Sequence, residues 1–94
     1  MHYDHVLSLP SRFDYAYYKK FTEAYMALLH SVDVNNAILD FSNVEHLDSA
    51  ALGMMVLMQK KFKEQNKSVK LKGARGSTND ILRMANMNKI FEFI

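Results

Sequence analysis

The sequence predicts a small α/β sandwich in which crossover helices pack on a four-stranded, mainly parallel sheet. Short apolar stretches alternate with amphipathic ones in the order strand, helix, strand, helix, strand, helix, tail, and such alternation favours strands that run the same way. The length of 94 residues fits one compact domain, which we expect to span residues 1–94. A hydrophobic content of 49%, with six Phe and five Tyr, supplies a core and excludes a disordered chain.

The first half of the chain predicts two strands with a helix between them. Residues 6–9 suit a short strand that Pro10 ends or confines to an edge of the sheet. Residues 15–31 predict an amphipathic helix with Asp14 as its candidate N-cap. The apolar residues that recur there at helical spacing are Tyr17, Phe21, Ala24, Tyr25 and Leu28. Residues 37–41, which are largely apolar, then suit a central strand buried on both faces.

A second helix is predicted over residues 50–66, and its second half is rich in lysine. Its expected inward stripe consists of Leu52, Met55, Gln59 and Phe62. Val69 and Leu71 alternate with lysines and therefore predict a third strand with one face in water.

The last quarter of the chain predicts a turn at residues 73–76, a helix and a tail. Ser77 and Asp80 resemble a capping box, so Ser77 is the expected N-cap of a helix over residues 79–87. The residues of this helix expected to face the sheet are Ile81, Leu82 and Met84. Residues 91–94 are expected to close the domain as a short strand or a docked tail.

Composition excludes several classes of protein. The chain contains no cysteine, so it has neither disulfides nor thiolate metal ligands. No apolar run approaches the ~20 residues of a membrane span, and residues 1–15 do not resemble a signal peptide, so we expect a cytoplasmic protein with no membrane partner. His2 and His5 have a spacing seen in metal sites, but the only acidic residue next to them in the sequence is Asp4. We therefore expect no metal ion and no other cofactor.

Charge is unevenly spread along the chain. Residues 1–48 hold three basic and seven acidic side chains, whereas residues 49–94 hold nine basic and three acidic ones. Seven of the basic residues lie between Lys60 and Arg75. They can steer an acidic partner, or they can simply form a solvated helix face. Phe62 is the only aromatic residue among them, so we expect no nucleic-acid partner.

The most informative stretch is residues 37–53, where a serine follows an apolar strand and a polar turn. Ser49 stands where a strongly apolar helix begins, beside Glu45 and Asp48. A hydroxyl at that place can cap the helix, act as a nucleophile or accept a phosphoryl group. A nucleophile needs a base within hydrogen-bond reach, and the one nearby candidate, His46, has no obvious orienting partner. We therefore expect no catalytic residue and no enzymatic activity.

These residues resemble the signature of STAS domains, in particular that of bacterial anti-sigma factor antagonists. The stretches that carry the resemblance are ILDFSNV at 38–44 and LDSAALG at 47–53, with RFD at 12–14 and KG at 72–73. The likeness extends from Val6 to Phe93. One departure is Ala51, which stands where the family usually has glycine. Alanine favours helix by about 1 kcal/mol over glycine, and its methyl group is expected near the contact surface.

The resemblance implies a phospho-switch. Ser49 would be the phosphoacceptor for a partner serine kinase with a histidine-kinase-like ATPase fold, and a phosphatase would remove the phosphate. The unphosphorylated chain would bind the anti-sigma factor or related kinase, and phosphorylation would release it. An alternative is an accessory STAS subunit of a transporter or signalling complex, in which Ser49 is only a helix cap. Both a monomer and a weak homodimer remain open.

The expected partner surface surrounds Ser49. Asp40 ends a strand, where α/β sheets usually present ligand groups, and Asp48 either orients the hydroxyl or caps the turn. Residues 54–58 are all apolar, so some of them should be exposed unless the helix is buried on two sides. The residues expected to contact the partner are Asp14, Asp40, Ser42, Asp48, Ser49, Ala50, Ala51, Leu52, Met54 and Met58.

Overall fold

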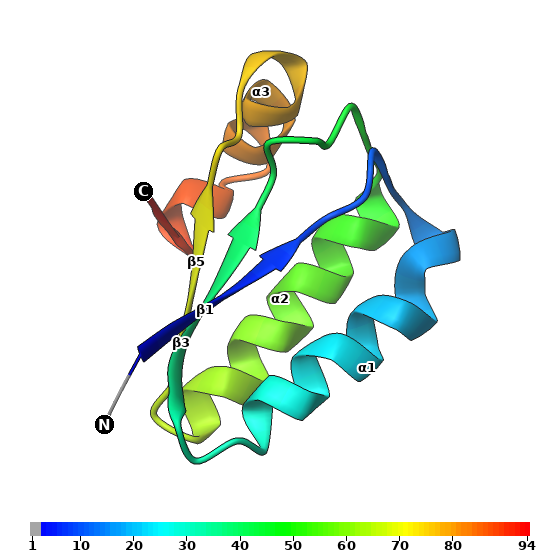
Figure 1. The fold of residues 1–94 in the computed structure, drawn as a ribbon. Helices are drawn as coiled ribbons and strands as arrows, with labels where there is room; N and C mark the ends of the chain where they lie inside the picture. The colour runs from blue at the N-terminus through cyan, green and yellow to red at the C-terminus, as the bar shows by residue number, and fades with distance from the viewer. Residues whose placement is uncertain (1–2) are drawn as a thin grey trace.

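The computed structural model describes residues 3–94, and its sheet and helices have the predicted α/β arrangement (Figure 1). Two helices lie against one face of the sheet, and a third lies at its carboxyl end. In chain order the elements are β1 (Tyr3–Ser8), β2 (Arg12–Phe13), the 3-10 helix η1 (Tyr15–Tyr17), α1 (Tyr18–Leu29), β3 (Val34–Asp40), β4 (His46–Leu47), α2 (Ser49–Glu64), β5 (Ser68–Lys72), α3 (Gly76–Met84), the 3-10 helix η2 (Met87–Lys89) and β6 (Glu92–Phe93).

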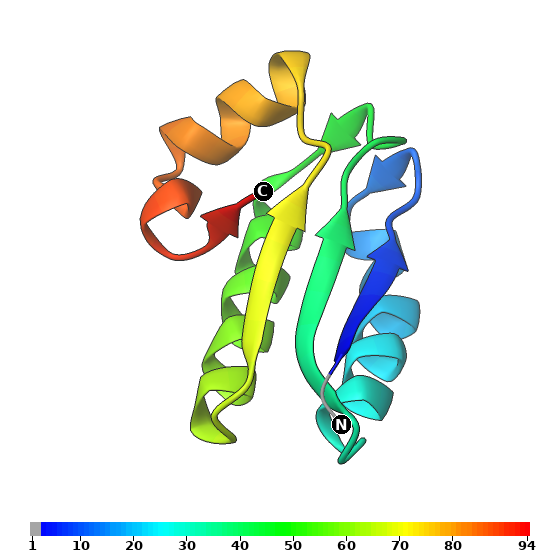
Figure 2. The ribbon, with the colours of Figure 1, turned by 60° about the vertical axis from the view of Figure 1, so that its left-hand side comes forward.

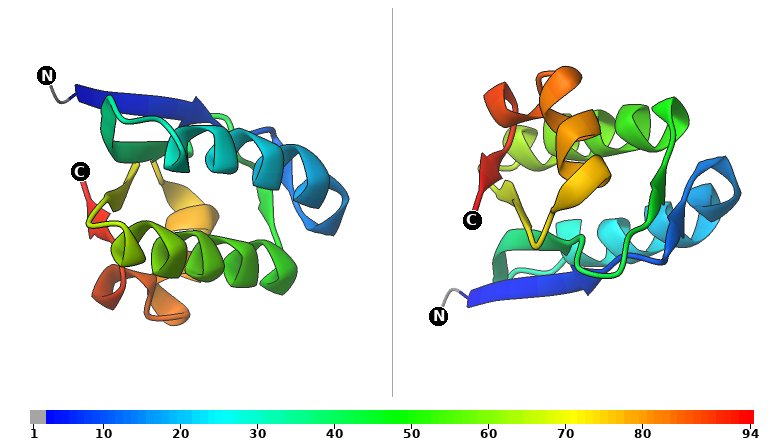
Figure 3. Two further views of the ribbon diagram at one scale, coloured as in Figure 1. Left: turned by 90° about the horizontal axis from the view of Figure 1, so that it is seen from below. Right: turned by 90° about the horizontal axis from the view of Figure 1, so that it is seen from above.

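The main sheet has the strand order β1-β3-β5-β6, and every neighbouring pair is parallel. This confirms the predicted four-stranded parallel sheet. Helices α1 and α2 lie side by side on one face of the sheet, as both views of Figure 3 show. Figure 2 shows the opposite face of β1, β3 and β5, which no helix among residues 3–94 covers.

The core lies between the sheet and the two helices. In β3 and β5, Leu39 is paired with Leu71 and Ala37 with Val69, and all four side chains are buried beneath α1 and α2. On the opposite face Ile38 is only 7% exposed even though no helix covers it. The central strand is therefore buried on both faces, as its apolar sequence predicts.

The start of α3 differs from the prediction. The helix begins at Gly76, and its N-cap is Arg75, which makes no side-chain capping bond. Ser77 therefore lies inside the first turn and is not the N-cap. The first turn is instead held by Thr78, whose buried hydroxyl donates to the carbonyl oxygen of Val44 at 3.2 Å. A tertiary contact thus sets this helix start, and the local capping pattern does not. Met84, expected to face the sheet, is 83% exposed.

The first helix also begins differently. Asp14 caps the 3-10 turn η1, because its Oδ1 atom accepts from the backbone N–H of Ala16 at 3.0 Å. The regular helix α1 follows at Tyr18 and ends at Leu29. At the other end of the chain, Glu92 and Phe93 pair with β5, so the tail is a short strand.

Lys67, in the loop after α2, binds to the C-terminal end of α1 at the end of the sheet away from α3. Its Nζ atom donates to the carbonyl oxygens of Leu28, Leu29 and Ser31 at 3.2, 2.8 and 2.6 Å. A cation at a helix C-terminus satisfies carbonyl groups that have no partner within the helix. This lysine is therefore a tertiary cap for α1.

The basic residues between Lys60 and Arg75 do not form one stripe. Lys67 caps α1, Lys70 lies 3.8 Å from the carboxylate of Glu92 on β6, and Arg75 donates to the carbonyl of Ser42 at 3.3 Å. These positions favour the simpler of the two interpretations, in which most of the lysines are solvated or paired. Across residues 3–94, no helix combines the length and apolar character that crossing a membrane requires.

Candidate functional site

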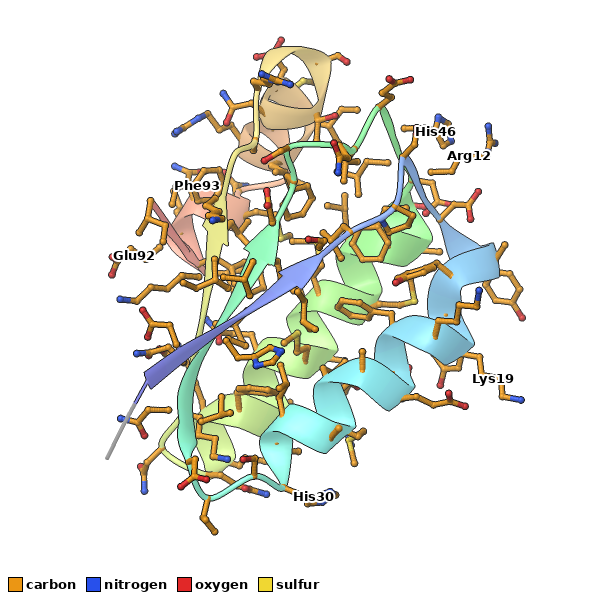
Figure 4. The ribbon with its side chains drawn as sticks, viewed as in Figure 1. Arg12, Lys19, His30, His46, Glu92 and Phe93 are labelled. Carbon is orange, nitrogen blue, oxygen red and sulfur yellow. The ribbon has the colours of Figure 1, made fainter. Side chains whose placement is uncertain are left out.

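The site is assembled by a second, very short sheet. Strands β2 and β4 pair in parallel, with Arg12 opposite His46 and Phe13 opposite Leu47. Figure 4 shows the labelled side chains of Arg12 and His46 next to each other. Phe13 and Leu47 are buried and anchor the pair to the core. The polar residues that follow each strand are thereby brought to one edge of the molecule.

Asp48 fixes the start of α2. Its backbone is extended, and its Oδ1 atom accepts from the N–H of Ala51 at 2.9 Å. The helix therefore has an aspartate N-cap, which is one of the favoured residues at this position. Of the two roles considered for Asp48, the structure shows the capping one.

Ser49 is the first residue of α2 and is exposed. Of the three roles open to its hydroxyl, capping of the helix is not the one that the structure shows, because Asp48 is the N-cap. Within residues 3–94 the Ser49 hydroxyl makes no hydrogen bond with the protein, and His46 donates none to it. The hydroxyl is therefore presented to solvent at the amino end of a 16-residue helix.

The surroundings of Ser49 contain charges of both signs. Arg12 and Asp14 form an ion pair of 3.2 Å, with 71% and 18% of their side-chain surfaces exposed. An exposed pair of this kind contributes little to stability. Glu45 and His46 are both exposed on the strand and loop that lead into α2. A group attached to Ser49 would meet backbone N–H groups of the first helical turn on one side and this mixed surface on the other.

Asp40 and Ser42 lie at the other end of the β3–β4 connection. The Oδ1 atom of Asp40 accepts from both the backbone N–H and the hydroxyl of Ser42. These two hydrogen bonds, with a smaller contribution from the charge of Lys72, hold the pKa of Asp40 below its usual value. Arg75 also donates to the Ser42 carbonyl, so this turn is fixed from two sides.

Gly73 is required for that turn to pack. Its φ angle is +75°, and a Cβ atom added there would lie 2.6 Å from the Ser42 hydroxyl and 3.0 Å from Asp40 Oδ1. An L-residue at this position would therefore be strained and would collide with the loop. This explains the glycine of the KG pair at residues 72–73.

The outer surface of α2 differs from the prediction. Met54 is 8% exposed and Met58 is not exposed at all, so the expectation that they lie on the surface beside Ser49 is wrong. The methyl group of Ala51 is also fully buried and faces the core, not a partner. These residues are buried because α2 packs on β5 and on α1, so that two sides of the helix are covered.

The apolar residues that α2 exposes are Val56 and Leu57, at 37% and 44%. Gly53 is also exposed, and these three residues lie on the same side of α2 as Ser49. The spacing in the sequence indicates this shared side, since Ser49, Gly53 and Leu57 are four residues apart and therefore neighbours on one face of a helix. The apolar run 54–58 predicts that some of its side chains are exposed, and Val56 and Leu57 are, although neither is among the residues expected to contact the partner.

The predicted site residues that are exposed or half-buried form two groups. Asp14, Asp48 and Ser49 meet through the β2–β4 pair, with Ala50 and Leu52 half-buried beside them. Asp40 and Ser42 lie at the α3 end of the loop, next to Gly73 and Arg75.

No group of three or more His, Asp or Glu side chains in residues 3–94 is arranged to hold a metal ion. His2, part of the metal spacing considered above, lies outside the described residues.

Comparison with known proteins adds a family and several structural neighbours. A family model described as "Mlab, STAS domain" matches residues 3–92. A STAS-domain containing protein of Pseudomonas aeruginosa (strain UCBPP-PA14) is 26% identical over 86 residues, which cover 92% of this chain and 83% of that protein.

Solved structures share the fold at low sequence identity. A candidate anti-sigma factor antagonist from Thermotoga maritima has a TM-score of 0.79 at 21% identity, covering 94% of this chain and 77% of that one. The anti-sigma factor antagonist SpoIIAA from Bacillus, in its unphosphorylated form, has a TM-score of 0.79 at 12% identity, with 95% and 77% covered. A sulfate transporter family protein from Wolinella succinogenes has a TM-score of 0.77 at 13% identity, with 96% and 75% covered.

Proposed function

The chain belongs to the STAS domain family, and from this membership together with the position of Ser49 we propose that it is a phospho-switchable protein-binding regulator. In this proposal the unphosphorylated chain binds an anti-sigma factor or a related serine kinase. Phosphorylation of Ser49 releases that partner, and a phosphatase restores binding. The chain acts by binding and carries out no reaction itself.

The single observation that carries the proposal is the hydroxyl of Ser49 at the start of α2, which is exposed and makes no hydrogen bond within residues 3–94. A kinase must reach the hydroxyl oxygen, and no hydrogen bond within residues 3–94 has to be broken first. Because Asp48 caps the helix, modification of Ser49 removes no structural contact. The fold is therefore expected to remain intact when the phosphate is added.

The added phosphate acts mainly on the partner. It brings a charge of about −1.5 to −2 and three acceptor oxygens. The N-terminal amides and the dipole of α2 stabilise such a dianion within the chain. A protein docked over Ser49 would instead face new charge and bulk next to the carboxylate of Asp48. We therefore expect a large loss of affinity with little change in stability.

The proposed docking surface follows α2 outward from Ser49. Gly53, Val56 and Leu57 supply an apolar strip on the same exposed side of the helix, and exposed apolar residues beside polar ones are typical of protein interfaces. The half-buried residues Asp14, Asp48, Ala50 and Leu52 would contribute at the edge of this surface. Asp40 and Ser42 would extend it along the β3–β4 loop, which crosses the carboxyl end of the sheet (Figure 1).

The proposed partner is an anti-sigma factor or serine kinase with a histidine-kinase-like ATPase fold, which would supply the nucleotide. The structural neighbour SpoIIAA supports this proposal. It is an anti-sigma factor antagonist with structures in both phosphorylated and unphosphorylated forms, and their TM-scores to this chain are 0.71 and 0.79.

The experiment compares three forms of the chain as bait for proteins of the native cell: the parent, Ser49→Ala and Ser49→Asp. We expect the parent and Ser49→Ala to retain the same ATPase-fold protein and Ser49→Asp to retain much less of it. The isolated pair, incubated with ATP and magnesium, should add one phosphate to the parent and none to Ser49→Ala, as measured by intact mass.

Ser77 provides a matched control, because it is also an exposed serine in the first turn of a helix. Ser77→Asp should bind like the parent. If Ser49→Asp binds as well as the parent and the parent accepts no phosphate, the proposed switch is wrong.

A second function is an accessory STAS subunit of a transporter or signalling complex that works without phosphorylation. The structural likeness to a sulfate transporter family protein favours it. This function predicts a constitutive partner whose binding is disrupted by Leu57→Lys, and a mass that is unchanged by ATP and the partner. The same capture and mass measurements therefore separate the two functions.

A further inference from the structure

A small polar pocket lies on the far side of the loop from Ser49, between the end of β5, α3 and the C-terminal strand. It has a volume of about 280 Å³ and is lined by Lys72, Gly73, Asn79, Arg83 and Phe93, among others. Ligand pockets commonly measure about 300–1,000 Å³, so this one suits a single small group. Neither Ser49 nor any other residue of α2 lines it.

Arg83 is held in place at the mouth of this pocket. Its Nε atom donates to Asn79 Oδ1 at 3.3 Å, and its guanidinium carbon lies 4.9 Å from the centre of the Phe93 ring. Within residues 3–94 its two Nη atoms make no hydrogen bond. A planar guanidinium fixed on an aromatic ring loses less conformational freedom when it binds an oxyanion in a bidentate manner.

The backbone of Gly73 supplies a second donor. The carbonyl of Lys72 points toward β3, where it accepts from the N–H of Phe41 at 2.8 Å. In a trans peptide the N–H points opposite to the C=O, so the Gly73 N–H points toward the β6 side of β5. The last bond on that side joins the Ile94 N–H to the Leu71 carbonyl. Among residues 3–94 the Gly73 N–H therefore has no hydrogen-bond partner.

The charges around the pocket are positive. Lys72 and Arg83 both line it, and none of the residues that line it is acidic. Asp40 is paired with Lys72 across β3 and β5, so their charges interact, and its Oδ1 atom accepts two hydrogen bonds from Ser42. Glu92 on β6 is paired with Lys70. The pocket thus combines two cationic side chains and a backbone donor, and no acidic side chain lines it.

From these contacts we propose that this pocket binds a phosphate dianion, either free or as the monoester group of a small metabolite. A phosphate group has enough oxygens to accept from the Arg83 guanidinium, the Lys72 ammonium and the Gly73 N–H together. A carboxylate has two oxygens, one fewer than these three donors. The site is independent of the proposed switch, because it does not involve Ser49.

The test is a titration of the ¹⁵N-labelled chain, followed by NMR at constant ionic strength. The probes are inorganic phosphate and glycerol 3-phosphate, with chloride as the reference anion. We expect saturable shifts of the Gly73 amide and the Arg83 Nε–H. A stronger response to glycerol 3-phosphate indicates a monoester ligand, and an equal or weaker one indicates free phosphate.

Variants decide whether the pocket itself binds. Arg83→Gln and Lys72→Gln should each weaken binding about tenfold or more, the loss of one charge-assisted hydrogen bond. Lys89→Gln, at an exposed lysine of η2, removes the same charge outside the pocket and should leave binding unchanged. Thermal melts of all three variants check that they are folded. No saturable shift at Gly73, or an equal effect of all three substitutions, would overturn the proposal.

Discussion

Asp14 and Asp48 occupy equivalent positions one residue beyond the paired strands β2 and β4, and each caps the helix that follows it. Asp14 accepts from Ala16 and Asp48 accepts from Ala51. Because the two strands are parallel, the two helix starts lie at the same edge of the molecule. The amino end of α2 is thus set by an aspartate, and the adjacent serine carries no structural hydrogen bond.

The first prediction concerns the separate roles of Asp48 as the helix cap and of Ser49 as the proposed phosphoacceptor. Asp48→Ala should lower the free energy of unfolding by about 1 kcal/mol, because the N–H of Ala51 loses its acceptor. Ser49→Ala should change it by less than about 0.5 kcal/mol. Urea denaturation of the two variants measures both values. An equal loss in both would show that the serine also caps the helix.

The second prediction separates the core of α2 from its outer surface. Met58→Lys should destabilise the fold by at least about 3 kcal/mol, because the side chain is fully buried. Leu57→Lys should cost less than about 0.5 kcal/mol but weaken binding of the captured partner. Thermal melts and pull-downs of both variants distinguish the two roles. A melting temperature for Met58→Lys close to that of the parent would contradict the burial of the Met58 side chain.

The third prediction compares Gly73, in a turn, with Gly53, in helix α2. Gly73→Ala should destabilise the chain by about 1–2 kcal/mol or more, since the residue has a positive φ and its Cβ would contact Ser42 and Asp40. Gly53→Ala should instead stabilise it by about 0.5–1 kcal/mol, because the position is helical and open. Chemical denaturation should therefore move the two midpoints in opposite directions.

The fourth prediction concerns acid. The pKa of Asp40 is lowered in the folded chain, chiefly by the Ser42 hydroxyl and then by the Ser42 N–H. The lowered pKa stabilises the fold above the ordinary value of 3.8, and this stabilisation is lost as the pH falls through the folded pKa. Ser42→Ala should raise the pKa of Asp40 toward its ordinary value and reduce this acid dependence.

An NMR titration of the Asp40 carboxyl carbon measures that shift directly. Ser77→Ala, which removes a hydroxyl that does not bond to Asp40, should leave the titration curve where it is. If Ser42→Ala leaves the Asp40 titration unchanged as well, the hydroxyl is not the source of the lowered pKa.

The fifth prediction addresses Lys67. Lys67→Met should lower the free energy of unfolding by about 1–3 kcal/mol, because two carbonyl groups at the end of α1 and that of Ser31 just beyond it lose a charged donor. Lys63→Met removes the same charge from an exposed part of α2 and should have little effect. Hydrogen exchange should locate the loss at the last turn of α1.

The sequence was sufficient to predict the fold because its apolar periodicities are local properties. The alternation at Val69 and Leu71 and the apolar stretch around Ile38 predict their strands directly. The start of α3 was not predicted correctly, since it depends on the contact of Thr78 with Val44, which is distant in the chain. The role of Lys67 was missed for the same reason.

In the candidate site too, the features that depend on contacts between distant parts of the chain could not be predicted from the sequence. The position of Ser49 at a helix start follows from the sequence, but the orientation of α2 does not. Met54 and Met58 are buried because α1 covers one side of the helix and β5 another. A run of five apolar residues has no periodicity from which that second contact could be deduced. The pairing of β2 with β4, which brings Asp14 to Asp48, involves strands too short to be recognised.

The aspartate cap of α2 has a consequence for how such a protein can diversify. Since the Asp48 cap does not involve the neighbouring hydroxyl, the proposed switch would be lost through a single codon change at position 49 without loss of the fold. Under that proposal, duplicated genes would pass between a regulated and a permanently binding form without an intermediate that misfolds.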